Sequence, residues 1–147
     1  MYFPNFVKKY YSIEHDAEWF KAVELKKPKN VEFHNVPWNY PRTMPTQLKQ
    51  FKTYVNYIKK LNVEQFDKIL IDGRARGWCA EAALQFLHKD SVVFIHDFWH
   101  RPQYHIVFNW YEEISSIKNQ ELQTVIALKP KSEYIGVDRI KTSIENS

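Results

Sequence analysis

Residues 66–101 read FDKILIDGRARGWCAEAALQFLHKDSVVFIHDFWHR, and this stretch decides the fold. It holds two apolar runs, Phe66–Asp72 and Ser91–Asp97, each of the length of a buried strand. Between them, Trp78–Leu87 repeats small and apolar residues at helical spacing. A strand, a helix and a second strand in this order predict two neighbouring parallel strands joined by a helical crossover. Because both runs are continuously apolar, we expect them to be buried on both faces of the sheet.

The N-terminal part continues the alternation of strands and helices. Lys9–Ile13 and Asn30–Val36 have the pattern of short strands. Between them, Asp16 can cap a helix that extends to about residue 25. Three prolines make Pro37–Pro45 a loop. Apolar residues then recur every three or four positions over Thr46–Leu61, which predicts an amphipathic helix.

The C-terminal part predicts a helix followed by a hairpin. Pro102 suits the first turn of a helix that continues to about Tyr111. Glu112–Lys118 and Glu121–Lys129 then predict two antiparallel strands that turn around residues 119–120. The tail from Lys131 is polar, and we expect it to be frayed. We find no internal repeat and no linker, so we expect a single α/β domain over residues 1–147.

Composition narrows the function classes. Hydrophobic residues make up 44% of the 147-residue chain and aromatic residues 16%, which is enough for a core and excludes a disordered protein. The net charge of +4 is spread along the chain and does not require a nucleic-acid partner. No apolar run approaches the about 18 residues of a membrane span, and the N-terminus has no signal-peptide pattern. We therefore expect a cytoplasmic protein without a membrane partner.

Glycine and cysteine are scarce. The three glycines, Gly73, Gly77 and Gly136, form none of the glycine-rich loops that cradle phosphates. A single cysteine, Cys79, excludes a disulfide framework, and its place on an apolar helix face predicts a small buried hydrophobe. Any nucleotide-binding site in this chain therefore lacks its usual loop.

Two aspartates follow the two central strands, Asp72 in ILIDGRAR and Asp97 in VFIHDFWHR. In open α/β sheets, ligands bind beyond the carboxyl ends of the strands, so neighbouring strands would bring these aspartates to one cleft. Each aspartate has a simpler interpretation as the cap of the following segment. The basic residues expected at the rim of this cleft are His96, Arg74, Arg76 and Arg101.

Five segments in this order resemble the class I S-adenosylmethionine-dependent methyltransferase family. The IDGRxR and HDxxxR stretches are also similar to a subgroup of uncharacterised methyltransferase-like proteins. The resemblance spans about residues 9–130. Its segments are YYSIEHDAEWF at 10–20, VEFHNVP at 31–37, FDKILIDGRARGWCAEAALQFL at 66–87, SVVFIHDFWHRPQYHIVFNWYEEI at 91–114 and LQTVIALKPK at 122–131.

The resemblance implies a Rossmann-like, mostly parallel sheet with flanking helices, and S-adenosylmethionine as cofactor. Glu14, after the second strand of the family, would hold the ribose hydroxyls. Asn35 would lie near the adenine, and Asp72 would be the active-site aspartate. Some members of the family hold Mg²⁺ with carboxylates that here would be Asp72 and Asp97.

These expectations combine into a methyl transfer to a hydroxyl of a small substrate. Asp72, His96 and Asp97 would be catalytic, with His96 as the general base because histidine titrates near neutral pH. A zinc site at His96 and His100 is not expected, since His96 lies on a strand end and His100 in a loop, so the spacing of four is not that of a helix. An anionic substrate would bind the guanidinium groups, which pair well with carboxylate or phosphate. These groups belong to Arg74, Arg76 and Arg101.

One feature of the family is missing, namely its first strand and glycine-rich turn, which normally form the centre of the sheet. Either the chain is a truncated version of a longer protein, or a partner or a second copy supplies the strand, or the fold has lost cofactor binding. The last case is a non-catalytic binding or scaffold protein. A third class, nucleic-acid binding, has the pI near 9.0 in its favour but no recognised motif.

Overall fold

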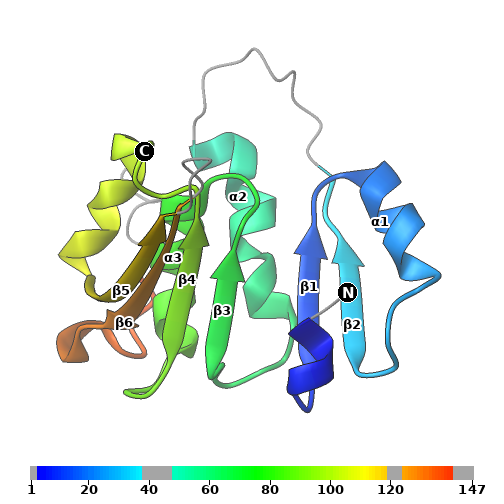
Figure 1. Ribbon diagram of the computed structural model, residues 1–147, viewed down its shortest axis with the longest axis horizontal. Helices are drawn as coiled ribbons and strands as arrows, with labels where there is room; N and C mark the ends of the chain where they lie inside the picture. The colour runs from blue at the N-terminus through cyan, green and yellow to red at the C-terminus, as the bar shows by residue number, and fades with distance from the viewer. Residues whose placement is uncertain (1–2, 38–47, 119–123, 141–147) are drawn as a thin grey trace. The chain divides into compact units, whose positions relative to one another are not determined.

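The computed structural model describes residues 3–37, 48–118 and 124–140 (Figure 1). The chain divides into two compact units, an N-terminal unit over Met1–Leu61 and a C-terminal unit over Asn62–Ser147. Each unit has its own sheet.

The N-terminal unit is built on two parallel strands, β1 (Tyr10–Glu14) and β2 (Val31–Asn35), with Tyr10 opposite Val31. A crossover helix, α1 (Ala17–Glu24), connects them. Asp16 caps this helix through its side chain, which accepts hydrogen bonds from the backbone N–H groups of Glu18 and Trp19, both at 3.0 Å. A short 3₁₀ helix (Phe3–Phe6) precedes β1, and α2 (Leu48–Asn56) with a further 3₁₀ turn (Tyr57–Lys60) ends the unit.

The C-terminal unit is a four-stranded mixed sheet in the order β3-β4-β6-β5. The strands β3 (Lys68–Ile71) and β4 (Val92–His96) are parallel and are joined through α3 (Arg76–Ala83) and a 3₁₀ turn (Leu84–Phe86). The hairpin of β5 (Tyr111–Lys118) and β6 (Thr124–Pro130) adds to β4 in antiparallel fashion. Two further 3₁₀ segments, Pro102–Asn109 and Ser132–Tyr134, flank the hairpin.

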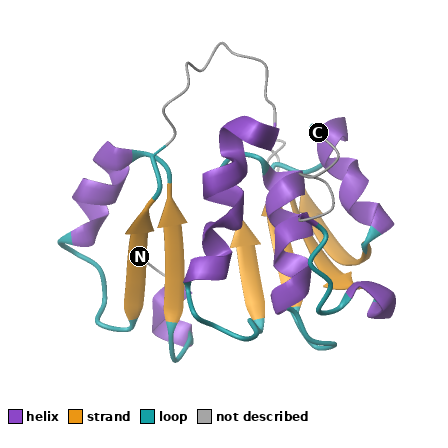
Figure 2. Ribbon diagram, turned by 180° about the vertical axis from the view of Figure 1, so that it is seen from behind, coloured by secondary structure: helices purple, strands orange, loops and turns teal. Residues whose placement is uncertain are grey.

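Helix α3 covers one face of this sheet, the face turned to the viewer in Figure 2. Its alanines are nearly inaccessible to solvent, which lets the helix approach the strands closely. A Cβ atom at Gly77 would lie 3.3 Å from Ile106, so the glycine also allows the 3₁₀ segment at 102–109 to pack tightly on the helix. The core residues of this face include Ala80, Leu84, Leu87, Val93, Ile95, Ile126 and Leu128.

The α/β prediction is confirmed, as are the adjacent parallel strands and the antiparallel hairpin at the sheet's edge. The predicted strands and helices occur in the expected order, shifted at their ends by a few residues. The predicted 102–111 helix forms, but as a 3₁₀ segment. Most of the predicted loop over Pro37–Pro45, and the turn at residues 119–120, lie outside the described residues.

The expectation that the strand at Phe66–Asp72 is buried on both faces was wrong. Lys68 is exposed, and the side chain of Leu70 is 44% exposed. Ile71 is part of the core and Ile69 packs against it, on the opposite face of the strand from Lys68 and Leu70. In the described part of the chain, β3 pairs only with β4 and β1 pairs only with β2, so β1 and β3 each have one unpaired edge.

The expectation of a frayed tail from Lys131 was also wrong for residues 131–140. Ile140 is fully buried, and Arg139 Nε lies 3.4 Å from the carboxylate of Glu81 on α3. The Arg139 guanidinium lies over two rings, Trp110 and Tyr134, each with its centroid 5.4 Å away. These contacts fasten the segment to the body of the unit.

Every helix in the described ranges is too short or too polar to span a lipid bilayer.

Candidate functional site

The candidate site lies at the carboxyl ends of β3 and β4. Asp72 directly follows β3, and His96 ends β4 with Asp97 after it. Because the two strands are parallel neighbours, with Ile71 opposite Ile95, both ends meet at one edge of the sheet. The structure therefore brings together the residues that the sequence predicted there. We name Asp72, Arg76, His96, Asp97 and Arg101 the strand-end cluster.

His96 lies between the two carboxylates. Its Nδ1 atom is 2.9 Å from Asp72 Oδ1 and 3.6 Å from Asp97 Oδ1. A carboxylate this close to Nδ1 favours the tautomer with the proton on Nδ1 and leaves the lone pair on Nε2. The imidazole is 29% exposed, so solvent or a small ligand can reach it.

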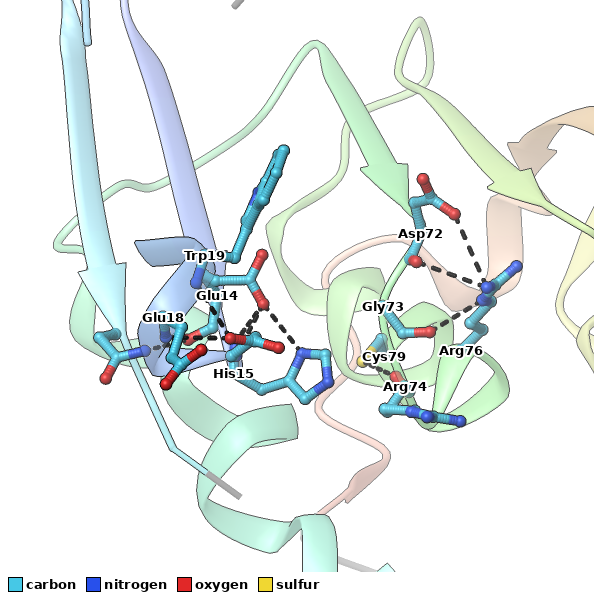
Figure 3. Close-up of polar contacts among 11 residues, drawn as sticks. Glu14, His15, Glu18, Trp19, Asp72, Gly73, Arg74, Arg76 and Cys79 are labelled. Atoms are coloured by element: carbon cyan, nitrogen blue, oxygen red, sulfur yellow. Dashed lines mark hydrogen bonds and ion pairs between the residues drawn. The ribbon is translucent and has the colours of Figure 1, made fainter. Parts of the chain in front are cut away.

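Arg76 ties the two strand ends together. It is buried at the start of α3, and its guanidinium donates hydrogen bonds to the backbone carbonyls of Gly73 (from Nε, 2.9 Å), Asp72 (from Nη2, 3.4 Å) and His96. The same group lies 3.6 Å from the Asp72 carboxylate and 3.9 Å from that of Asp97. Figure 3 shows Arg76 directed at Asp72 and Gly73. These contacts favour a positioning role for Arg76 over the predicted contact with substrate.

The other two arginines are exposed. The Arg101 side chain is 45% exposed, and its Nη2 lies 3.9 Å from Asp97 Oδ2. Arg74 is exposed in the loop after β3, where its backbone carbonyl accepts a hydrogen bond from the Cys79 thiol at 3.5 Å. Burial raises the pKa of Cys79 to about 12 despite the nearby Arg76 charge, so the thiol stays protonated.

Backbone geometry at the cluster is unusual. Asp97 has a φ of 50° and Ala75, just before α3, a φ of 52°. Aspartate adopts this left-handed region with local side-chain support, whereas alanine pays roughly 1–2 kcal/mol for it. Such strained residues concentrate where a site fixes its geometry. Here they lie in the two strand-end segments that contact the Arg76 guanidinium.

The strand-end cluster does not fit a divalent cation. Asp72 and Asp97, the predicted Mg²⁺ ligands, both face Arg76, and Asp97 also faces Arg101. A guanidinium beside each carboxylate repels a cation and satisfies the charge that would bind it. Among the described residues, no three acidic, histidine or cysteine side chains group in a way that could hold a metal ion.

In the N-terminal unit, Glu14 is the last residue of β1, and one of its carboxylate oxygens accepts hydrogen bonds (Figure 3). Oε1 accepts hydrogen bonds from the backbone N–H groups of His15 (2.7 Å) and Asp16 (2.8 Å), and the His15 ring lies 3.0 Å away. Burial alone would raise the pKa of Glu14, but these contacts hold it below its ordinary value. No bond to Oε2 is found within the described residues. Asn35 lies beside Glu14, since its side chain donates to the Glu14 carbonyl at 3.1 Å.

The sequence analysis did not predict a group of three polar side chains that contact one another in the N-terminal unit. Glu32 Oε1 lies 3.0 Å from His34 Nε2, and the Tyr57 hydroxyl lies 3.1 Å from His34 Nδ1. The signal was available in part, because residues two apart on a strand share a face and Glu32 and His34 are so spaced. Tyr57 comes from a distant segment and gave no local signal.

No protein-family profile matches the sequence, and no curated protein matches it. A solved methyltransferase-like protein from Silicibacter pomeroyi matches 82% of this chain and 68% of its own, at 18% identity and a TM-score of 0.55. The chain has a methyltransferase-like fold.

Two other solved methyltransferases overlap more loosely with this methyltransferase-like fold. One is the ribosomal protein L11 methylase from Lactobacillus delbrueckii subsp. bulgaricus, with 12% identity, coverage of 87% and 73%, and a TM-score of 0.47. The other is phosphoethanolamine N-methyltransferase 2 from Haemonchus contortus, solved with phosphomonomethylethanolamine and S-adenosylhomocysteine. It has 10% identity, coverage of 84% and 34%, and a TM-score of 0.41.

Proposed function

We propose that this chain is an S-adenosylmethionine-dependent methyltransferase that acts on a hydroxyl group of a small anionic substrate. The observation that carries the proposal is the pairing of His96 with Asp72 at the carboxyl edge of a methyltransferase-like sheet. That edge is where ligands bind in open α/β folds. A histidine oriented by a carboxylate is also the arrangement that general-base chemistry requires.

The reaction assigns a role to each part of the strand-end cluster. S-adenosylmethionine would supply an electrophilic methyl group. His96 Nε2 accepts the proton of the substrate hydroxyl as the oxygen forms its bond to the methyl carbon. The cofactor would keep the electron pair of the broken carbon–sulfur bond on its sulfur. Asp72 stabilises the imidazolium that results, and most of the rate comes from alignment of the two reactants.

Substrate binding falls to the exposed arginines. Arg101 and Arg74 are accessible at the same edge and can pair with a carboxylate or phosphate. Arg76 is already committed to three backbone carbonyls and keeps the cluster in place. In the N-terminal unit, we assign to Glu14 Oε2 the ribose hydroxyls of the cofactor and to Asn35 a position near the adenine.

A second candidate is a binding protein that has kept the fold without the reaction. The same ion pairs favour it, because a carboxylate neutralised by Arg76 can be purely structural. The scarcity of glycine also favours it, since no glycine-rich loop is present to approach the cofactor.

Titration of the isotope-labelled chain with S-adenosylhomocysteine tests the proposal residue by residue. We expect amide resonances of Glu14, Asp72 and Asp97 to shift at a ligand concentration of about 1 mM, which detects binding worth about 4 kcal/mol. Unchanged resonances at these residues would contradict cofactor binding. If they shift, product formation by wild type and His96→Gln separates the two candidates, because only the enzyme loses activity on substitution.

A further inference from the structure

Apolar side chains are exposed at the N-terminal end of the N-terminal unit. The 3₁₀ helix at 3–6 precedes β1 (dark blue in Figure 1) and buries only Pro4. Phe3 is 57% exposed, Phe6 70% and Val7 40%. Where exposed apolar side chains form a contiguous patch, the surface usually contacts a protein or a membrane.

Lysines gather at the same end because β1 and β2 are parallel. Lys8 lies two residues before β1, and Lys26 and Lys29 precede β2. The segments that lead into the two strands are joined by Asn30, whose side chain donates hydrogen bonds to the backbone carbonyls of Pro4 (2.7 Å) and Val7 (2.9 Å). Phe3, Phe6, Val7, Lys8, Lys26 and Lys29 therefore belong to segments that meet at this end of the strands, which we name the basic end.

The charges of the basic end are not used within the unit. Among the described residues, Lys8, Lys26 and Lys29 form no ion pair, and all three are exposed. Two further lysines nearby do pair, Lys9 with Glu32 at 3.2 Å and Lys27 with Glu24 at 3.1 Å. Each of these two ion pairs has no net charge, so the net positive charge of the basic end comes from the three exposed lysines.

Acidic residues lie at the opposite end of the strands. Glu14 ends β1, and Asp16 and Glu18 begin α1. The unit therefore has a positive end with apolar side chains and a negative end with the predicted ribose ligand. Leu25, which follows α1 and precedes the lysine-bearing loop, is a further apolar side chain in the unit and is 92% exposed.

We propose that the basic end binds an anionic lipid surface, with Phe3 and Phe6 inserted at the headgroup boundary. Protein interfaces are depleted in lysine, whereas interfacial membrane segments combine Lys with Phe and Leu. Lysines near a bilayer are attracted by its negative surface potential. The expectation of no membrane partner rested on the absence of a spanning segment, and surface binding needs none. The proposal is independent of the strand-end cluster.

Sedimentation of the full chain with lipid vesicles tests the proposal. We expect binding to phosphatidylcholine vesicles that contain phosphatidylserine, none to phosphatidylcholine alone, and weaker binding as salt is raised. Neutralising the lysines in K8Q/K26Q/K29Q lowers the partition coefficient by about a hundredfold. Phe6→Ser with Leu25→Ser lowers it as well, because insertion is lost.

The matched control is Ile117→Ser, which removes a 68% exposed apolar side chain from the C-terminal unit. It leaves vesicle binding unchanged, and circular dichroism verifies that every variant is folded. Failure of the wild type to bind the phosphatidylserine vesicles overturns the proposal. So does an equal loss in Ile117→Ser, unchanged binding in the Phe6→Ser, Leu25→Ser variant, or tighter binding to single-stranded RNA than to the vesicles.

Discussion

His96 Nδ1 lies 2.9 Å from Asp72 Oδ1, and this contact joins the ends of β3 and β4, which are 25 residues apart in the sequence (Ile71 and His96). The contact exists because β3 and β4 are parallel neighbours. It also depends on Arg76, whose guanidinium holds the backbone on both sides of the pair. The chemistry of the candidate site and the integrity of the sheet edge therefore share one side chain.

Replacing that side chain tests its structural role. Arg76→Leu leaves the carbonyls of Gly73 and His96 without their donors, and we expect a loss of about 2–3 kcal/mol of unfolding free energy. Arg101→Leu is the control, because an exposed ion pair contributes under about 1 kcal/mol. Urea denaturation measures both. Equal losses in the two variants would contradict the role given to Arg76.

Mg²⁺ is expected to leave the melting temperature of the wild type unchanged. Arg76 and Arg101 already face the Asp97 carboxylate, so no charge is left to attract the cation. Asp97→Asn keeps a residue that tolerates the left-handed backbone and removes the charge. Thermal melts with and without MgCl₂ compare the two proteins. Stabilisation of the wild type that disappears in Asp97→Asn would restore the predicted metal site.

Glu14 makes stability depend on pH. Its pKa is held below the ordinary value of 4.5 by His15 and Asp16, against the effect of burial. A carboxyl with a depressed folded pKa stabilises the protein above its unfolded pKa, and this contribution is lost as pH falls through the folded pKa. Glu14→Gln is therefore less stable than wild type at neutral pH, and the difference narrows below about pH 4.5. Denaturation at several pH values measures the narrowing.

The control for Glu14 is Glu133→Gln, since Glu133 is exposed in the C-terminal unit. Denaturation of Glu133→Gln at the same pH values provides the reference for the effect of removing a carboxylate. A constant difference for Glu14→Gln would mean that its hydrogen bonds do not depend on the charge.

S-adenosylmethionine is expected to bind this chain weakly, with a Kd above about 10 µM, or less than about 7 kcal/mol of binding free energy. The chain carries no glycine-rich loop that would let its backbone approach the cofactor closely. Isothermal titration calorimetry measures the affinity. A Kd in the low micromolar range would show that the remaining contacts suffice without such a loop.

Arg139 is expected to stabilise the C-terminal unit through Glu81. Arg139→Leu leaves a carboxylate that is 6% exposed without this cation, which costs about 2–4 kcal/mol. The control removes a surface pair: Lys129 lies 3.1 Å from Glu112 with both side chains half exposed, and Lys129→Gln costs under about 1 kcal/mol. Denaturant unfolding distinguishes the two. A similar small loss for Arg139→Leu would show that the tail is only loosely held.

Local signals predicted the framework well. The helix at 17–24 follows from Asp16, whose cap needs only the next three residues. The parallel pair β3 and β4 follows from two apolar runs separated by a helix. Where the evidence is short-range periodicity and a cap, the sequence suffices.

The errors and omissions come from contacts between distant residues. Arg139 meets Glu81 across 58 positions of sequence, so nothing near residue 131 indicates that the segment is ordered. The role of Arg76 depends on the left-handed Ala75, which no propensity favours. Exposure of Leu70 depends on which face of the sheet the rest of the unit covers. None of these has a periodic signature.

The left-handed backbone at Asp97 also limits how this position can vary over evolutionary time. Besides glycine, only asparagine and aspartate enter that conformation readily. Drift that preserves only the turn would therefore exchange Asp, Asn and Gly freely. Retention of aspartate alone would require selection on its charge. The residues that homologues carry here would thus report whether the carboxylate has been kept for chemistry or the turn merely for shape.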